Sequence, residues 1–242
     1  MKNVLIVGGT SGLGLELALK FFGAGHRVVV TGRRNVRDKT FSFNVPSEGC
    51  KTIHAEYLNL TFNGDSIGRV IFTNFGQDGV DILVYAAGFY QEGTMSELTE
   101  TDIDEMLFVG LRSPALFLRY ILKHQEKLPG FIAITSTSQW TPRLKEPIYN
   151  AVKGGLFMLA SSVSLDERVG KVLVAAPAGM NTAFWRNKSR EDFDFSTLLD
   201  PKWVAEKVIQ LYDEKRSYKF RFAKILREPP RVVDQEIRFS NI

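Results

Sequence analysis

Apolar and polar positions follow two different patterns along this chain, and the two patterns alternate. Short apolar runs of strand length stand at residues 3–7, 27–31, 51–58, 81–86, 131–135 and 171–176. Stretches with apolar residues at helical intervals stand at 12–23, 65–75, 100–127, 149–168 and 201–213. Strands that alternate with helices predict an α/β fold, a doubly wound parallel β-sheet flanked by helices. At 242 residues, the chain is expected to form this as a single domain, residues 1–242.

Three segments follow neither pattern. Residues 35–50 contain many turn formers and are predicted to be a loop, and residues 177–200 are predicted to be irregular. The charged segment 214–242 supports no assignment. Inside the longest helical stretch, Gly110 and Pro114 predict a kink, because proline removes a helix hydrogen bond.

A glycine-rich turn joins the first apolar run to the first helix. Glycine lets the backbone adopt otherwise forbidden angles, and the free N–H groups at the helix start attract phosphate. The predicted phosphate contacts are Gly8, Thr10, Ser11, Gly12, Leu13 and Gly14. Their spacing, G-x-x-x-G-x-G, differs from the general G-x-G-x-x-G fingerprint of dinucleotide-binding proteins. A glycine-rich turn without a ligand is the alternative interpretation.

The end of the second strand indicates which dinucleotide would bind. Strand, glycine turn, helix and second strand form a βαβ unit of the Rossmann type, in which an acidic residue at this point would hold the 2′-hydroxyl of NAD. The chain has Thr31-Gly32-Arg33-Arg34 instead. A guanidinium is suited to bidentate contact with a 2′-phosphate, so the sequence predicts NADP(H). Two exposed arginines on a loop are the alternative.

Tyr149 and Lys153 are four residues apart on a predicted helix, so their side chains share one face. A nearby ammonium is expected to lower the pKa of tyrosine, which would then exchange a proton with a carbonyl or alcohol oxygen during hydride transfer. Ser136 and Ser138, after the fifth strand, are both candidates to hold that oxygen. Alone, a Tyr-x-x-x-Lys pair is a weak signal.

With these motifs in this order, the chain resembles the short-chain dehydrogenase/reductase family over about residues 2–213. The family's T-G-x-x-x-G-x-G motif begins here with Val7 in place of threonine, and its Tyr-x-x-x-Lys motif is intact. Its Asn-Asn-Ala-Gly motif corresponds to Tyr85-Ala86-Ala87-Gly88, so both asparagines are lost. The loop after the sixth strand matches at Pro177-Ala178 and Thr182.

This resemblance implies an enzyme and assigns roles to its residues. Ser136, rather than Ser138, would position the substrate oxygen, Tyr149 would transfer the proton, and Lys153 would also bind the nicotinamide ribose. Arg33 falls at a basic position common in members that prefer NADP. Further cofactor contacts implied by the resemblance are Arg34, Asn59, Leu60, Ala86, Ala87, Gly88, Pro177 and Thr182. The resemblance also implies a homodimer or homotetramer built on the helices at 100–127 and 149–168.

Two departures from the family pattern stand out. Gly110 replaces an asparagine that often supports a water-linked proton relay to the lysine. The usual Gly-rich C-terminal ending is replaced by Lys219-Phe220-Arg221-Phe222 and a basic tail. Gly110 and the two lost asparagines make a catalytically weak NADP(H)-binding sensor or scaffold the alternative to an NADP(H)-dependent carbonyl reductase or alcohol dehydrogenase.

Aromatic residues follow several of the predicted strand ends. Phe89, Tyr90, Trp140, Phe184 and Trp185 would line an apolar pocket for a carbonyl compound. Packing of a lid or a subunit interface explains them equally well. Residues 182–199, which include Phe193 and Phe195, are the candidate substrate lid.

The composition narrows the remaining classes. A formal net charge of +4 raises the possibility of a nucleic-acid binder, but the excess is small and dispersed, so no nucleic acid is predicted. No apolar run reaches the roughly 18 residues of a membrane span, and the first strand leaves no room for a signal peptide. Cys50 is the only cysteine, which suits the cytoplasm. The three histidines are scattered, so no metal site is expected.

We expect Arg33→Ala to weaken NADPH binding far more than NADH binding, because only NADPH carries the 2′-phosphate. Titration of the protein with each dinucleotide measures the two dissociation constants. Equal losses for both cofactors would reject the 2′-phosphate contact.

Overall fold

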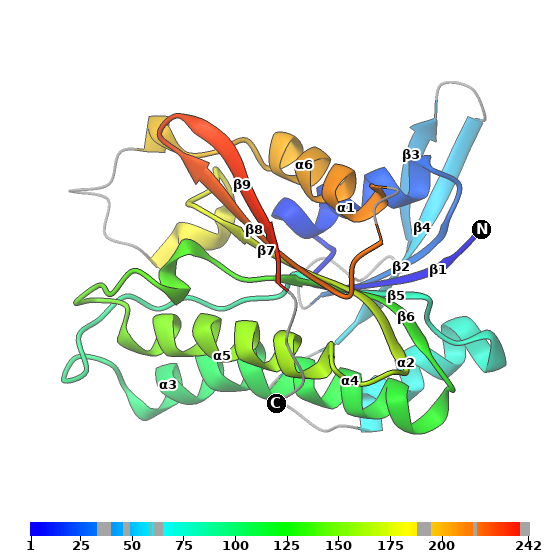
Figure 1. Ribbon diagram of the computed structural model, residues 1–242, viewed down its shortest axis with the longest axis horizontal. Helices are drawn as coiled ribbons and strands as arrows, with labels where there is room; N and C mark the ends of the chain where they lie inside the picture. Colours follow the sequence, from blue (N-terminus) through cyan, green and yellow to red (C-terminus); the bar gives the residue numbers. More distant parts are fainter. Residues whose placement is uncertain are drawn as a thin grey trace.

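A computed structural model describes residues 1–32, 40–45, 49–58, 60, 65–187, 195–214 and 217–237. It has one central sheet with helices on both faces (Figure 1). Within these ranges no helix is long and apolar enough to cross a membrane.

The sheet runs in the order β3-β4-β2-β1-β5-β6-β7-β8-β9. Its strands are β1 (Asn3–Val7), β2 (Arg27–Gly32), β3 (Thr40–Val45), β4 (Gly49–Tyr57), β5 (Ile82–Tyr85), β6 (Leu128–Ile134), β7 (Val169–Pro177), β8 (Phe220–Arg227) and β9 (Pro230–Glu236). The strands from β4 to β8 pair in parallel, whereas β3 and β9 pair antiparallel at the two edges. The doubly wound parallel sheet is thus confirmed. Its strand order reverses between β1 and β5, which is where such sheets bind ligands.

The helices divide between the two faces of the sheet (Figure 1). The α-helices are α1 (Gly12–Gly23), α2 (Asp65–Phe75), α3 (Glu100–Leu107), α4 (Ser113–His124), α5 (Pro147–Val163) and α6 (Pro201–Asp213). Shorter turns are η1 (Gly76–Asp78), η2 (Phe108–Arg112), η3 (Thr137–Gln139), η4 (Ala183–Asn187) and η5 (Phe195–Thr197). Alternate residues of β1 supply the two cores: Val4 and Ile6 pack toward α1 and α6, and Leu5 and Val7 toward α2, α4 and α5.

The prediction of a loop over residues 35–50 was wrong in part. Strand β3 pairs with β4 as a hairpin, with Val45 opposite Gly49. Thr40, Phe41 and Ser42 have a strand-like composition, but the turn formers at 44–49 outweighed it. Two of them, Asn44 and Gly49, lie in the paired strands.

The C-terminal segment also forms strands that its sequence did not predict. Arg221 lies in β8 and is only 4% exposed, because it pairs with Glu214 and Asp234, each at 2.6 Å. A buried arginine is tolerated only when it is paired in this way. Because those partners lie on other elements, the sequence around Arg221 did not indicate a buried strand. Phe220 and Phe222, which flank Arg221 in β8, belong to the hydrophobic core.

The predicted break in the long helix takes the form of one π-helical turn, η2, between α3 and α4. Pro114 lies in the first turn of α4, where the missing N–H is tolerated. A Cβ on Gly110 would lie 2.1 Å from Val152 Cγ1 of α5. Glycine at this position therefore allows η2 and α5 to approach closely.

We expect Gly110→Ala to lower the free energy of unfolding by about 1–2 kcal/mol, because overpacking against Val152 exceeds the gain in helix propensity. Gly154→Ala is the matched control, since its Cβ would meet only Gln139 O at 3.8 Å. That variant is expected to be neutral or stabilised by up to about 1 kcal/mol. Denaturant unfolding of both variants measures the difference, and equal stabilities would contradict the steric explanation.

Candidate active site

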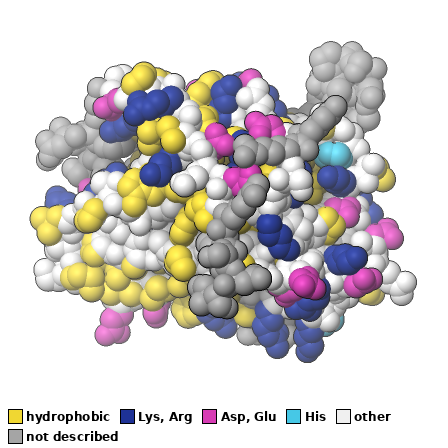
Figure 2. Space-filling model, in the orientation of Figure 1, with side chains coloured by type: hydrophobic (Ala, Val, Ile, Leu, Met, Phe, Trp, Pro, Cys, Tyr) yellow, Lys and Arg dark blue, Asp and Glu magenta, His cyan; other side chains and the backbone are white. Residues whose placement is uncertain are grey.

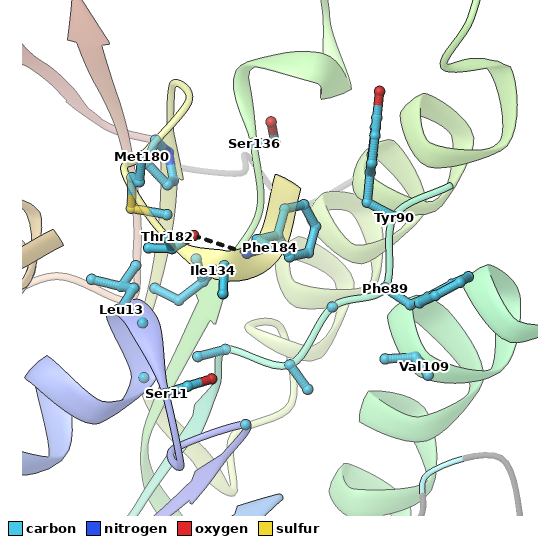
Figure 3. A pocket seen from close by; sticks show the side chains of 18 of the residues that line it. Ser11, Leu13, Phe89, Tyr90, Val109, Ile134, Ser136, Met180, Thr182 and Phe184 are labelled. Carbon is cyan, nitrogen blue, oxygen red and sulfur yellow. Dashed lines mark hydrogen bonds between the residues drawn. The ribbon is translucent and has the colours of Figure 1, made fainter. Parts of the chain in front are cut away.

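A cavity of about 300 Å³ lies at the carboxyl ends of the central strands, beside the point where the strand order reverses. All the described residues that the sequence singled out for catalysis or cofactor binding, except Ser138, line it: Gly8, Thr10, Ser11, Gly12, Leu13, Gly14, Leu60, Ala86, Ala87, Gly88, Ser136, Tyr149, Lys153, Pro177 and Thr182. Figure 3 shows this cavity between the glycine turn, which carries Ser11 and Leu13, and the opposite wall with Tyr90 and Phe89. Arg33, Arg34 and Asn59 lie outside the described residues.

The glycine turn brings three backbones together. Gly8 and Gly12 have φ angles of +84° and +55°, which side chains rarely tolerate. A Cβ on Gly8 would lie 2.6 Å from Ala87 Cα, and the N–H groups of Gly8 and Gly9 both donate to Thr31 O at 3.1 Å. The turn therefore presses the ends of β1 and β2 against the segment that follows β5.

The start of α1 leaves its first N–H groups without a side-chain cap. Ser11 is the N-cap residue, but its side chain makes no capping hydrogen bond. These N–H groups and the positive end of the helix dipole thus border the cavity, as a dinucleotide phosphate would require.

The end of β2 has no room for a side chain at its last residue. A Cβ on Gly32 would lie 2.1 Å from Thr10 Oγ1. An acidic residue of the kind that holds the ribose of NAD would displace Thr10 if placed there. The described residues at the end of β2 that could contact the ribose are thus Thr31 and Gly32, and neither carries a charge.

Helix α5 and strand β6 deliver the three candidate catalytic side chains. Tyr149 and Lys153 lie one turn apart on the buried side of α5, 5% and 4% exposed, and Ser136 follows β6 as the N-cap of η3. Lys153 Nζ donates to Ile134 O at 3.1 Å and lies 5.6 Å from the centre of the Tyr149 ring. The hydroxyl, phenol and ammonium therefore face one cavity.

Burial dominates the electrostatics of these groups. It raises the pKa of Tyr149, while hydrogen bonding with the Ser136 hydroxyl opposes that rise. Burial lowers the pKa of Lys153 to about 8. In the protein alone the pKa of Tyr149 is therefore raised, because desolvation of the phenolate is the largest effect, and the lowering of this pKa by Lys153 stays a prediction.

The two candidate serines have different surroundings. Ser136 lines the cavity, whereas Ser138 lies behind it. Ser138 Oγ donates to Glu146 Oε2 at 3.0 Å and accepts from Arg143 at 2.7 Å. The sequence did not indicate Glu146 or Arg143 as site residues, and the only available signal was the position of Glu146 one helical turn before Tyr149.

Aromatic side chains form the wall opposite the glycine turn. Tyr90 packs edge-on against Tyr149 with ring centres 5.2 Å apart, and it also contacts Phe184 and Trp185. Phe184 reaches across the cavity in Figure 3, with its N–H donating to Thr182 Oγ1 at 3.4 Å. Of the five aromatic residues proposed for the pocket, the four that line it are Phe89, Tyr90, Phe184 and Trp185.

Trp140 does not line this cavity. Its ring packs against Phe222 at 5.6 Å and under the ammonium of Lys224 at 4.8 Å. The sequence placed it near the pocket because it follows β6, but η3 turns it toward β8 instead.

Hydrogen bonds join the two flanks of the candidate lid. Asn181 N donates to Leu199 O and Leu199 N donates to Gly179 O, both at 2.9 Å. The two flanks of the candidate lid, at Asn181 and Leu199, therefore lie side by side. Phe193 and the side chain of Phe195 lie outside the described residues.

A family model described as short chain dehydrogenase matches residues 2–192. The chain belongs to the short-chain dehydrogenase family. It is 26% identical to the 3-oxoacyl-[acyl-carrier-protein] reductase FabG of Aquifex aeolicus over 229 residues, which cover 90% of this chain and 92% of that protein.

Solved structures share the fold. A dehydrogenase/reductase from Sinorhizobium meliloti has a TM-score of 0.75 at 21% identity and covers 93% of each chain. A short chain dehydrogenase from Burkholderia cenocepacia, solved in complex with NADP, has a TM-score of 0.70 at 19% identity and covers 87% of this chain and 89% of that one.

Two departures from the short-chain dehydrogenase motifs meet in space. Tyr85 replaces the first asparagine of the Asn-Asn-Ala-Gly motif, and its buried hydroxyl donates to the carbonyl of Val109 in η2. The next residue is Gly110, where Val152 occupies the space of any side chain. Tyr85 thus anchors the π-helical turn at the point where the family's asparagine is absent.

We expect Lys153→Met to raise the free energy of unfolding at pH 7 by up to about 3 kcal/mol, because burying the ammonium has lowered its pKa from 10.5 to about 8. The folded-state pKa is depressed, so the unfolded chain holds more protons between pH 8 and 10.5 and wild-type stability rises with pH in that window. The advantage of the variant should therefore shrink from pH 7 to pH 10.

Denaturant unfolding at the two pH values measures this difference. Lys202→Met, at an exposed position of α6, is the control and should show neither the gain nor its pH dependence. A Lys153→Met protein that is less stable than wild type at both pH values would contradict a desolvation penalty.

Proposed function

We propose that this protein is an NADP(H)-dependent oxidoreductase that transfers a hydride between NADPH and a carbonyl or alcohol substrate. One observation carries the proposal: the side chains of Ser136, Tyr149 and Lys153 face the same cavity as the glycine turn. The family membership already supports an enzyme that acts on CH–OH or C=O groups.

The residues present fit a dinucleotide. The uncapped start of α1 and the glycines at 8 and 12 form a cradle in which added Cβ atoms would be strained. NADP rather than NAD is supported by the uncharged end of β2, by Arg33 and Arg34 directly after it, and by the NADP bound to the Burkholderia cenocepacia protein. We propose that the dinucleotide bound here supplies or accepts the hydride.

The protein's own groups would manage the substrate oxygen. The Ser136 hydroxyl donates a hydrogen bond that holds the oxygen, and Tyr149 transfers a proton to it in reduction or from it in oxidation. Lys153 binds the nicotinamide ribose and places its positive charge beside the phenol, which favours the phenolate. Phe184 and Trp185 cover the reacting groups and exclude water.

The walls of the cavity favour an apolar carbonyl compound. Lys153 is the only charged side chain among the described residues that line it. Five aromatic residues also line it, Phe89, Tyr90, Tyr149, Phe184 and Trp185, and such sites suit ligands that are mostly apolar.

We further propose a homo-oligomer in the cytoplasm. Figure 2 shows hydrophobic side chains gathered over α3 and α5, where Leu107 and Met158 are 38% and 59% exposed. An apolar helix face of this kind is typical of a subunit interface. A single cysteine suits a reducing compartment.

We expect Tyr149→Phe to lower kcat/KM by at least about 100-fold, because it removes the proton donor but keeps the ring. NADPH affinity should stay within about twofold, since phenylalanine retains the packing against Tyr90. A panel of ketones, aldehydes and alcohols with NADPH or NADP+ measures turnover, and fluorescence titration measures binding.

Undiminished turnover in Tyr149→Phe would reject this mechanism. Tight cofactor binding by the wild-type protein, with no turnover on any compound, would instead favour an NADP(H)-binding sensor or scaffold.

A further inference from the structure

A buried carboxylate lies directly behind the candidate catalytic tyrosine. Glu146 is the N-cap residue of α5 and is 7% exposed. It accepts hydrogen bonds from Ser138 Oγ at 3.0 Å, from Arg143 at 3.2 Å and from the Tyr90 hydroxyl at 3.3 Å. Burying a carboxylate is costly without such partners, so this cluster requires an explanation beyond packing.

Two serine hydroxyls connect this carboxylate to the cavity. Ser136 Oγ donates to Ser138 Oγ at 3.2 Å, and Ser138 Oγ donates to Glu146 Oε2 at 3.0 Å. Ser136 and Tyr149 line the same cavity, and the Ser136 hydroxyl lowers the pKa of the neighbouring phenol. The two serine hydroxyls both donate in the direction of the carboxylate, which is the polarity that a proton moving outward requires, while Ser138 N–H donates to Ser136 Oγ and Arg143 donates to Ser138 Oγ.

The series of hydrogen bonds from Ser136 to Glu146 reaches solvent at its outer end. Arg143 contacts both Ser138 and Glu146, and its side chain is 39% exposed. Burial and the charge of Glu146 raise the pKa of Tyr90, so its hydroxyl stays a donor to the carboxylate and does not compete as a proton source.

The usual route on the other side of Lys153 lacks its side chain. Gly110 has none, and Val152 occupies the space that a replacement would need. Among the described residues, Lys153 Nζ donates a hydrogen bond to the carbonyl of Ile134. The described side chains therefore provide no relay at Gly110, whereas they provide one through Ser138.

We propose that Ser138 and Glu146 form the proton relay of Tyr149, a role that rests on the oxidoreductase function proposed above. In alcohol oxidation, the phenol proton passes to Ser136, the Ser136 proton to Ser138, and the Ser138 proton to the Glu146 carboxylate. The proton that Ser136 has received then faces the cavity, where it holds the substrate oxygen. The phenolate then takes the alcohol proton as the hydride leaves the carbon, and Glu146 releases its proton to water beside Arg143. Carbonyl reduction runs in reverse, and one proton is exchanged with water in each turnover.

The first test replaces relay groups without emptying their positions. Glu146→Gln keeps an acceptor oxygen but takes up no proton, and Ser138→Ala breaks the chain one step earlier. Each should lower kcat by about 100-fold while leaving NADPH affinity within about twofold. The controls are Glu97→Gln, whose carboxylate also accepts from a hydroxyl, Thr94 Oγ1 at 2.9 Å, and Ser161→Ala, which removes a buried hydroxyl outside the relay.

Chemical rescue separates proton transfer from a structural role. Glycine is well tolerated at a helix N-cap, so Glu146→Gly should fold and leave a space in the carboxylate's place. Formate should raise the kcat of Glu146→Gly at least about tenfold, with a normal solvent isotope effect. It should not accelerate the wild-type protein or Glu97→Gln.

The outcomes distinguish this relay from the proposed function. Turnover by the wild-type protein with unimpaired Glu146→Gln and Ser138→Ala variants would overturn the relay alone, as would slow variants that formate does not rescue. If the wild-type protein turns over no substrate, NMR exchange of the Tyr149 hydroxyl proton with water decides instead. Slower exchange in Ser138→Ala would support the relay, and an unchanged rate would overturn it.

Discussion

The close approach of three strand ends around the glycine turn is the constraint on which the rest of the structure depends. Gly8 has no space for a Cβ against Ala87, and Gly32 has none against Thr10. A side chain at Gly8 would meet the backbone that follows β5, and one at Gly32 would displace the Thr10 side chain. Because this is also where the strand order of the sheet reverses, the same constraint that closes the core creates the crevice for a ligand.

Helix α5 supplies the second half of the site under a similar constraint. Its Val152 fits against Gly110, which brings α5 close to η2 and buries Tyr149 and Lys153 together. Burial opposes the ionisation of both groups. A buried ammonium is unfavourable for stability, so its presence here is better explained by the chemistry of the cavity than by folding.

The sequence was most informative where local pattern and tertiary environment agree. The βαβ unit at residues 3–31 and the start of α6 at Pro201 were predicted closely, because buried parallel strands and helix-starting signals depend on neighbouring residues. Strands β3 and β8 were missed. In β8, Arg221 is buried only because distant carboxylates accept its hydrogen bonds, and no local pattern contains that information.

For the candidate site, the sequence by itself determined the family, the glycine turn and the face shared by Tyr149 and Lys153, since these depend on short and regular spacings. Only the tertiary structure decided that Ser138 joins Glu146 behind the cavity, that Trp140 turns away from it, and that Gly110 is closed off by Val152. These contacts join separate elements, and their distances follow from how the elements pack. Packing also decided the electrostatics, because desolvation by burial is the largest influence on the pKa of Tyr149.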